Sequence, residues 1–419
     1  MGCAGVDARP TGERTGGRLT SRQTRGVLLV VAAVCVLAAQ LMWQHPWSPR
    51  PPYVDLQVYR AATSALFAGH DPYAALPGLQ LLFTYPPFAL IAFLPMLALG
   101  GTLLDAAQFA VSFVAFVVAV RCSLILNGER PGTRLASLTL AASALLLPLV
   151  PVVNTLRLGQ VDLVLLAAVL VDLSGGLRRL PRGLLIGLAA GLKLLPGVFV
   201  VYLVITGRRR AAGVAAATAL CTMLAGFAVA PADSWAYWTR LLYDEGRVGR
   251  PEMVLNQSLK GAVLAIPAGS ALWLVAALAT AVLGTLCAAR LYRLDYRLLS
   301  LGVYATATLL AAPISWVHYW VWAAPVAIAL LSMAWRNRHR TWRLPLVLAT
   351  VGWLLAFASW PYRLAAAAWL PAPLTGWTGQ LYVIAGLTLI AAAAVSVLRP
   401  SRRPSLSPAV SIDDAFGRV

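Results

Sequence analysis

Apolar residues fill most of this chain in long runs, and short polar segments separate the runs. Many of the runs approach the length of about 20 residues that a helix needs to cross a membrane. The pattern therefore predicts an all-α polytopic membrane protein with about 12 transmembrane helices. The apolar runs cover residues 27–43, 86–99, 103–120, 135–153, 160–174, 183–206, 211–230, 268–290, 298–313, 316–333, 344–360 and 378–398.

The composition excludes a soluble globular protein. Of the 419 residues, 60% are hydrophobic and 12% are charged, and the mean hydropathy is +0.75. A soluble domain carries about 25% charged residues. The formal net charge of +19 does not indicate nucleic-acid binding, because the basic residues lie in short clusters between apolar runs. This placement is typical of cytoplasmic loops, whose partner is anionic membrane lipid.

The polar segments suggest how the chain is organised. Residues 1–26 and 399–419 are polar and contain Arg, Pro and Ser, so we expect two disordered cytoplasmic tails. Residues 27–398 then form one transmembrane domain. Basic clusters at 207–210 and 336–343 mark the cytoplasmic side of the membrane.

Alternation of crossings from these clusters leaves two long segments outside, residues 44–85 and 231–258. Two topologies remain open for the middle of the chain. Either 86–99 and 183–206 each cross once, which leaves a basic cluster outside, or 183–206 is split at Leu195-Pro196 and 86–99 does not cross. We favour the split. Neither outer segment is large enough for a domain, so function must lie in a cavity built by helices and loops together.

The first outer segment predicts an amphipathic helix on the membrane surface. After Asp55, apolar residues recur at helical spacing as Leu56, Tyr59, Leu66 and Phe67. Asp55 stands where an N-cap belongs, so capping explains it without any chemistry. A carboxylate at a water-poor interface is also a plausible general base, because desolvation raises its pKa toward neutrality. Both interpretations stay open.

Other polar residues interrupt the apolar pattern further along. Lys193 lies about 15 Å along a helix from either end of its run, which is too deep for snorkelling. An intramembrane charge normally faces a cavity or a partner, and we interpret Lys193 as a phosphate ligand. Asn154, Arg157, Gln160 and Asp162 form a polar cluster that is either a solvated turn or a reader of sugar hydroxyls and phosphate.

Two later segments carry residue types that suit sugars or proton transfer. The second outer segment combines aromatic residues with the amides of Asn256 and Gln257, although aromatic residues also form ordinary interfacial belts. His318 follows Ser315-Trp316 at an outer helix end. It is either an interfacial residue or a group that faces Asp55 and moves a proton.

Several cofactor signatures are missing from the sequence. It contains no GxxxxGK[ST] loop and no HExxH, and no Asp-x-Asp motif that would hold a metal–nucleotide-sugar. The five cysteines show no metal spacing and predict no disulfide framework. We therefore expect no cofactor, no metal ion and no nucleotide-sugar donor.

A series of short motifs resembles one family. The chain is similar to actinobacterial polyprenyl-phosphate-mannose-dependent mannosyltransferases, which are glycosyltransferase family 87 members of the GT-C superfamily and include mycobacterial α-1,2-mannosyltransferases of phosphatidylinositol mannoside and lipoarabinomannan synthesis. The resemblance runs from about residue 50 to 325. Its motifs are Asp55-Leu-Gln-Val-Tyr59-Arg60, Gly69-His-Asp-Pro-Tyr73, Phe83-Thr-Tyr85-Pro86-Pro87, Gly159-Gln160-Val-Asp162, Lys193-Leu-Leu-Pro196, Asn256-Gln257-Ser258-Leu259 and Ser315-Trp316-Val-His318.

This resemblance implies a GT-C fold and an inverting transfer of mannose from polyprenyl-phosphate-mannose to a mannoside or lipoglycan, which forms α-1,2 linkages. The reaction would take place on the outer face of the plasma membrane, without a metal. The family's catalytic aspartate and histidine correspond to Asp55 and His318. Family members often carry a second histidine where this chain has Tyr319.

Two further groups of residues would bind the substrates. Lys193, with Arg157 or Arg247, would bind the donor phosphate. Sugar and acceptor contacts would come from Tyr59, Tyr85, Gln160, Asn256, Gln257 and Trp316.

A secondary transporter or flippase of lipid-linked sugar is the alternative function, with Lys193, Asp162 and Asp172 as intramembrane charges. Such proteins often contain internal repeats, and none is evident in the sequence.

Overall fold

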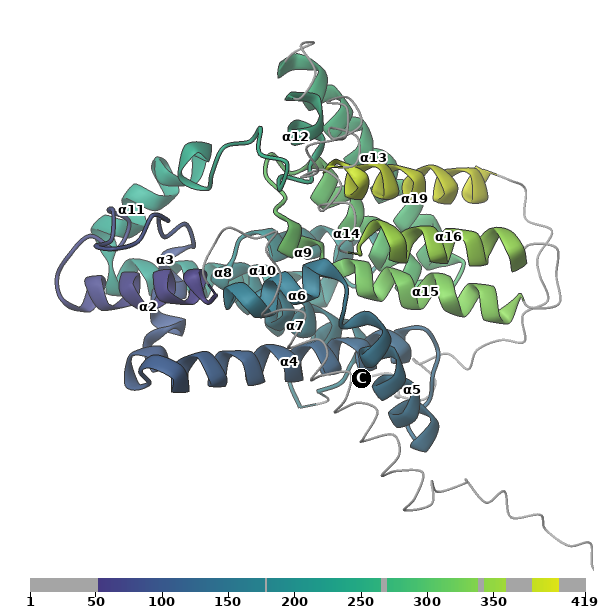
Figure 1. Ribbon diagram of the computed structural model, residues 1–419, viewed down its shortest axis with the longest axis horizontal. Helices are drawn as coiled ribbons and strands as arrows, with labels where there is room; N and C mark the ends of the chain where they lie inside the picture. The colour runs from purple at the N-terminus through teal and green to yellow at the C-terminus, as the bar shows by residue number, and fades with distance from the viewer. Residues whose placement is uncertain (1–51, 178, 265–269, 338–342, 359–378, 399–419) are drawn as a thin grey trace, which may run out of the picture.

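The computed structural model describes residues 52–177, 179–264, 270–337, 343–358 and 379–398 (Figure 1). Within these ranges the regular structure is helical, apart from one isolated antiparallel bridge between Asn256 and Trp316. The predicted all-α class is therefore confirmed for the described part of the chain. The predicted tails and the apolar run 27–43 lie outside it.

The helices follow the apolar runs, but many of them are short. The first described helix, α2 (Val54–Phe67), comes from the predicted outer segment. The others are α3 (Pro87–Ala92), η1 (Leu94–Ala98), α4 (Gly101–Leu126), α5 (Thr133–Leu146), α6 (Val150–Leu158), α7 (Asp162–Ser174), α8 (Leu184–Leu192), η2 (Leu195–Gly197), α9 (Val198–Ile205), α10 (Arg209–Val229), α11 (Pro231–Thr239), η3 (Leu241–Tyr243), η4 (Glu245–Arg247), α12 (Leu259–Leu264), α13 (Ser270–Arg293), α14 (Arg297–Ala311), η5 (Val317–Trp322), α15 (Ala323–Arg336), α16 (Arg343–Ala356) and α19 (Leu381–Leu398).

Four helices in the described ranges are long and apolar enough to cross a membrane. They are α4, α10, most of α13, and the continuous segment of η5 and α15. The pair α5 and α6 makes a fifth candidate, bent by 83° between its halves. Leucine and valine side chains on α10 and α13 are exposed, as a lipid-facing surface requires. The protein is thus polytopic, and the larger count of about 12 crossings stays a prediction.

Breaks in the helices follow the prolines. The run 183–206 separates into α8, η2 and α9, so the predicted break at Leu195-Pro196 is confirmed. The run 86–99 holds only the short helices α3 and η1. The run 135–153, which we had treated as one span, is instead two helices at a sharp angle around Pro148. A proline inside an apolar run removes a backbone donor and kinks the helix there.

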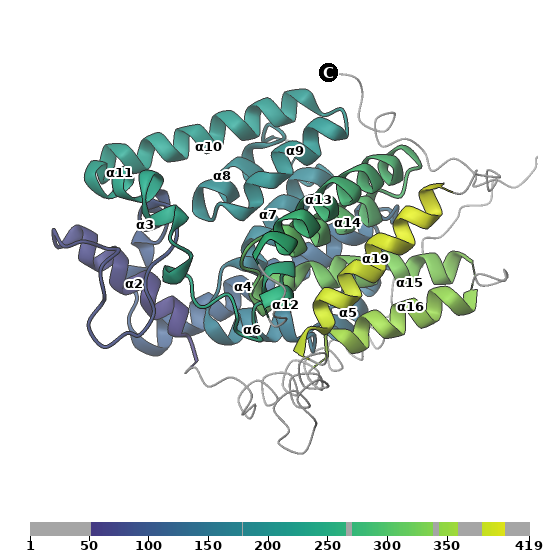
Figure 2. The same cartoon turned by 90° about the horizontal axis from the view of Figure 1, so that it is seen from above.

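The helices pack around two apolar clusters that meet along α7. The long helix α4 packs against α7, and α8 packs against α10 (Figures 1 and 2). Helices α13, α14, α15, α16 and α19 form the opposite side of the molecule (Figure 2). On α7, Leu166 belongs to the larger cluster, whereas Leu165 belongs to the smaller cluster around α2 and α3. Asp162 begins the helix that joins the two clusters.

Candidate active site

Asp55 is buried in the first turn of α2, with 8% of its surface exposed. The helix begins at Val54, and its N-cap is Tyr53, which has a left-handed backbone (φ 55°). The N-cap interpretation of Asp55 is therefore wrong, because the helix starts two residues earlier than that interpretation requires. One turn later lies Tyr59. Burial and the Asp55 carboxylate raise the pKa of Tyr59 well above its usual range, so this phenol stays protonated.

The start of α2 is held against the turn between α6 and α7. The backbone N–H of Tyr53 donates to the carbonyl of Arg157 at 2.7 Å. Gly159 ends α6 with φ 72°, and a Cβ at this position would come within 2.7 Å of the Leu56 Cβ. Only glycine allows both this conformation and this close approach. Gly159 thus allows α2, which carries Asp55, to lie close to Gln160 and to the start of α7.

Three predicted sugar-binding residues come together in a hydrogen-bonded triangle. The hydroxyls of Tyr59 and Tyr85 each donate to Oε1 of Gln160 at 2.7 Å. The two hydroxyls are 2.8 Å apart. The Tyr73 hydroxyl donates to the backbone carbonyl of Tyr85 at 2.9 Å, and Phe93 stacks on Tyr59. This network fixes a polar wall beside Asp55 in an otherwise apolar environment.

Lys193 forms a buried ion pair with Asp162. Its ammonium lies 2.7 Å from Oδ1 of Asp162, and each of the two side chains is 7% exposed. The same ammonium lies 4.0 Å from the centroid of the Tyr319 ring and 5.1 Å from that of Tyr85. The chain leaves the helical conformation at Lys193, just before Pro196, and the side chain extends from this break. The partner of Lys193 among the described residues is thus Asp162, and its contact with the donor phosphate stays a prediction.

His318 lies on the other side of the same carboxylate. Its Nε2 is 3.9 Å from Oδ2 of Asp162, and 5% of the residue is exposed. Within the described residues, no group donates a hydrogen bond to this Oδ2 atom. Asp55 interacts electrostatically with both Lys193 and Tyr319. The structure therefore gathers Asp55, Asp162, Lys193 and His318 in one buried cluster, which we call the ionic cluster.

Asp162 was not among the residues to which we had assigned a role in transfer. It stood in the polar cluster at residues 154–162, in the motif Gly159-Gln160-Val-Asp162 and in the transporter alternative. Its signal in the sequence was its place at the start of an apolar run, because a carboxylate there must find a partner. Asp162 is the first residue of α7, where the helix dipole also favours a negative charge.

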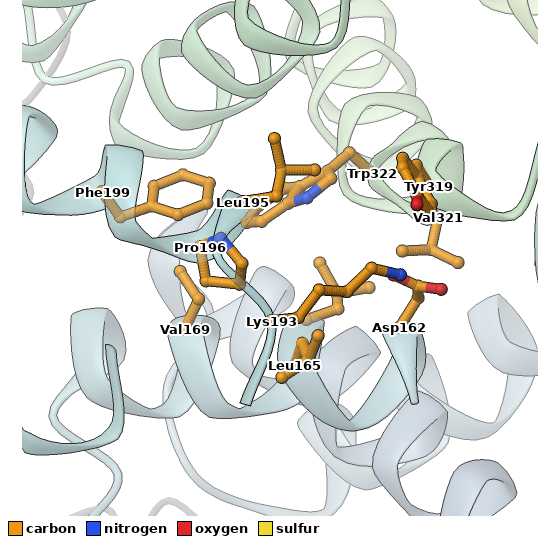
Figure 3. A pocket seen from close by; sticks show the side chains of 11 residues that line it. Asp162, Leu165, Val169, Lys193, Leu195, Pro196, Phe199, Tyr319, Val321 and Trp322 are labelled. Atoms are coloured by element: carbon orange, nitrogen blue, oxygen red, sulfur yellow. The ribbon is translucent and has the colours of Figure 1, made fainter. Parts of the chain in front are cut away.

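A small cavity of about 30 Å³ adjoins the ionic cluster. Figure 3 shows Lys193, Asp162 and Tyr319 at its polar end and Phe199, Leu195 and Trp322 at its apolar end. A cavity of this volume holds about one water molecule. Its polar end suits a charged oxygen atom of a ligand, and its apolar end suits a hydrocarbon group.

A larger apolar cavity of about 260 Å³ lies between α3, α8, α10 and α11. Two of its lining residues are the chain neighbours of residues described above: Leu194 follows Lys193 of the ionic cluster, and Pro86 follows Tyr85 of the polar wall. The indole N–H of Trp238 is buried beside it and meets no acceptor among the described residues. We call this cavity the apolar groove. Its lining residues are Pro86, Pro87, Phe88, Ala190, Gly191, Leu194, Gly197, Val200, Ala219, Leu220, Thr222, Met223 and Trp238.

Asn256 and Gln257 lie elsewhere, in a joint between two backbone segments. The Asn256 amide donates to the carbonyls of Pro251 and Pro313, and its Oδ1 accepts from the backbone of Ser315 at 2.8 Å. Both residues are fully buried. The Gln257 amide donates to the carbonyls of Val254 and Gly379, and its Oε1 accepts from the N–H of Tyr382. Both side-chain amides thus form their hydrogen bonds with backbone groups. We call Asn256, Gln257 and the backbone segments that they bind the backbone joint.

The remaining predicted residues lie around these two regions. Arg247 donates to the carbonyl of Tyr73 at 2.5 Å, and so connects the two predicted outer segments. Arg157 lies in the last turn of α6. Trp316 is 8% exposed, pairs with Asn256 through the backbone bridge and packs against Gly249. Their contacts with donor or acceptor stay predictions.

Comparisons with known proteins agree on one family. The model of glycosyltransferase family 87 matches residues 83–313. A polyprenol-phosphate-mannose-dependent alpha-(1-2)-phosphatidylinositol mannoside mannosyltransferase of Mycolicibacterium smegmatis is 33% identical, over 74% of this chain and 76% of the relative. A polyprenol-phosphate-mannose-dependent alpha-(1-2)-phosphatidylinositol pentamannoside mannosyltransferase of Mycobacterium tuberculosis is 34% identical, over 95% of both chains. No solved structure matches the chain.

Proposed function

Because the chain belongs to glycosyltransferase family 87, we propose that it transfers mannose from polyprenyl-phosphate-mannose to a mannoside or lipoglycan acceptor. We place the reaction on the outer face of the plasma membrane, in a domain of about 12 crossings with surface helices such as α2. The relatives are named as alpha-(1-2) mannosyltransferases, so we propose the same linkage. The alternative of a transporter or flippase is not favoured, because the family is one of glycosyltransferases.

The observation that carries this proposal is the ionic cluster. Asp162, Lys193 and His318 converge from three separate segments although each is buried, and Asp55 on α2 lies close enough to interact electrostatically with Lys193. Holding two carboxylates and an ammonium away from water is costly. A protein that needed only stability would fill this volume with apolar residues. Transfer from a lipid phosphate needs both a base and a cation close together.

The chemistry follows from these groups. The acceptor hydroxyl attacks C1 of mannose, and Asp55 takes the hydroxyl proton as general base. The bond between C1 and the phosphate oxygen breaks, and polyprenyl phosphate leaves with the electron pair. Lys193 stabilises the negative charge that develops on the phosphate. Attack in line on a β-linked donor inverts C1 and gives an α-linked product.

The polar wall beside Asp55 suits the sugar. We propose that Tyr59, Tyr85 and Gln160 contact mannose hydroxyls, because each tyrosine hydroxyl that donates to Gln160 can still accept a hydrogen bond, and Tyr59 interacts electrostatically with Asp55. Arg157 is our choice for a second phosphate contact. Arg247 is already engaged with the Tyr73 carbonyl, so we propose that it holds the loops over the site.

We propose an indirect role for the backbone joint. The amides of Asn256 and Gln257 are fully occupied by backbone groups, which leaves them little capacity to bind sugar directly. The joint sits next to Trp316 and the start of η5. It therefore fixes the segment that carries His318, and Trp316 is the member of the joint whose ring can contact the acceptor.

The apolar groove suits the polyprenyl chain of the donor. Leu194 and Leu220 on its walls are exposed, so the groove is open to hydrocarbon from the side. Lys193 lies next to Leu194 in the chain, which places a phosphate near the entrance of the groove. The Trp238 N–H is available for an oxygen of the donor head group.

The test is direct transfer by the purified protein in lipid nanodiscs. It is supplied with radiolabelled polyprenyl-phosphate-mannose and a dimannoside acceptor, and the product is digested with linkage-specific mannosidases. We expect a labelled, α-1,2-linked product that forms without added metal. Uptake of the donor across proteoliposomes with no new glycosidic bond would favour the transporter alternative.

A further inference from the structure

The ionic cluster is short of positive charge for its proposed ligand. With neutral histidine it holds one cation, Lys193, and two carboxylates, Asp55 and Asp162. A sugar–phosphate–lipid diester brings one more negative charge. In a site that excludes water, such an excess of one sign is strongly unfavourable. Even with Arg157 of α6 as the second phosphate contact, one negative charge stays in excess when the donor binds, and one proton gained by the cluster would balance it.

Asp162 also binds the Lys193 ammonium, which is the group that the donor phosphate needs. Its Oδ1 accepts from the Lys193 ammonium at 2.7 Å, while its Oδ2 faces His318 Nε2 at 3.9 Å. A hydrogen bond between these atoms requires an approach to about 2.8 Å, or a shift of about 1 Å. A small rotation of the carboxylate is enough. It would release the ammonium on one side and form a charged pair on the other.

We infer that donor binding protonates His318 and transfers Asp162 from Lys193 to the resulting imidazolium. In the empty enzyme Asp162 is the counterion of Lys193, and in the donor complex the phosphate takes its place. The proton comes from solvent and no covalent bond changes in this step. Asp162 is thus a positioning residue that couples donor affinity to pH. This inference rests on the proposed function.

On the helices packed against η5, the carboxylate that an ion pair places beside His318 is that of Asp162, and Asp55 on α2 is the other carboxylate of the ionic cluster. Segment η5 packs against α6, α7, α14 and α15. Helix α6 contributes the cation Arg157 and α7 contributes Asp162. The charged residue of α14 is Arg297 at its first position, and that of α15 is Arg336 at its last position. Both positions are the ends of these helices that are farther from η5 in the sequence. Tyr319, adjacent in η5, contributes an uncharged phenol at neutral pH.

The decisive experiment counts protons on ligand binding. Methyl farnesyl phosphate is a suitable probe, because a phosphodiester keeps one negative charge across the pH range. Its binding to the full-length protein in nanodiscs is measured by calorimetry at pH 8, in buffers of different ionisation enthalpy. We expect uptake of about one proton per phosphodiester in the wild type. Asp162→Asn removes the second carboxylate, and its uptake should fall to none.

Kinetics give an independent readout. Above the range where an imidazole titrates, near pH 6.5, the wild-type KM for donor should rise by up to about tenfold per pH unit. In Asp162→Asn this slope should disappear. A merely structural role for Asp162 would raise KM equally at every pH and leave the slope unchanged, which would contradict the inference.

Two further variants keep the test decisive. His318→Gln cannot accept the proton, so it should bind the probe weakly and take up none, even if Asp162→Asn does not fold. Asp172→Asn removes another buried carboxylate from α7, one that accepts from the backbone of Gly183 and Ile186, and should leave the proton count unchanged. Wild-type binding without proton uptake, or no binding at all, overturns the inference. Absence of mannose transfer by the wild type would instead overturn the proposed function.

Discussion

The ionic cluster and the backbone joint contain similar residues in opposite situations. Both are polar groups buried in an apolar protein, and both come from motifs that pointed to sugar or phosphate chemistry. In the joint, the polar atoms of the Asn256 amide are bonded to backbone groups. In the cluster, Oδ2 of Asp162 accepts no hydrogen bond from the described residues, and Lys193 faces a cavity.

This difference separates structural from reactive polar residues. A buried amide that completes backbone hydrogen bonds stabilises the fold, and its loss leaves carbonyls unsatisfied. A buried ion pair contributes little net stability, because desolvation cancels much of its attraction. Its retention in a core therefore points toward binding or chemistry, whereas burial alone does not.

The largest expected effect is at Asp55. Asp55→Asn keeps the size of the side chain but removes the base, so kcat should fall about 10²- to 10⁴-fold while donor binding stays near the wild-type value. Single-turnover assays with labelled donor measure this. Gln57→Ala, on the exposed side of the same turn, is the matched control and should transfer normally. Near-normal turnover by Asp55→Asn would show that Asp55 is not the base and that its burial, like that of the joint amides, serves the structure.

Replacement of Lys193 should have the next largest effect. A hydrogen bond from a charged group contributes about 1.5–3 kcal/mol, so Lys193→Ala should weaken donor use by about 10- to 150-fold. Lys193→Arg should recover part of this, because the charge survives in a different geometry. The loss should be the same whichever acceptor is supplied, since the contact is with the donor phosphate. A folded Lys193→Ala protein with unchanged donor kinetics would contradict the phosphate role.

The sequence predicted the cluster only in part, and the reason is physical. Lys193 and the break at Pro196 were visible because a charge and a proline both interrupt an apolar run. The pairing of Lys193 with Asp162 was not visible, since it depends on how α7 and α8 pack. The position of Asp55 relative to Gln160 likewise depends on Gly159, which lies about a hundred residues from α2 in the chain.

At the backbone joint, prediction from the sequence failed for a different reason. Asn256 and Gln257 belong to residue types that bind sugars and also to types that complete backbone hydrogen bonds, and composition does not distinguish the two. Their partners Ser315 and Gly379 are distant in the sequence. The bend between α5 and α6 had a local signal in Pro148, which we did not use. Local breaks are therefore predictable, whereas long-range partners are not.

A smaller effect is expected in the apolar groove. Ala219→Phe places a ring in the proposed path of the polyprenyl chain. Lost burial of two methylene groups costs about 1.6 kcal/mol, so KM for a long-chain donor should rise about tenfold. KM for a donor with a very short lipid should not change. Ala217→Phe, on an exposed face of the same helix, is the control and should leave both donors unaffected. Equal losses for long and short donors would place the lipid elsewhere.

The smallest effect on chemistry is expected at the joint itself. Asn256→Ala removes an amide that donates to the carbonyls of Pro251 and Pro313 and accepts from Ser315. Leaving a buried group unsatisfied costs about 1–3 kcal/mol, so the protein should denature at a lower temperature. Per folded molecule, however, the KM for donor should stay within about twofold of the wild type, because Lys193 and Asp162 are untouched. The Gln257 N–H and the Ser258 hydroxyl still bond to the carbonyls of Ser315 and Pro313, and so still hold the segment that carries His318. Thermal denaturation in nanodiscs, combined with active-site titration, separates the two quantities. Gln57→Ala again serves as the neutral reference for stability. A large rise in donor KM without loss of stability would instead assign Asn256 to the substrate, and would remove the distinction between the joint and the ionic cluster.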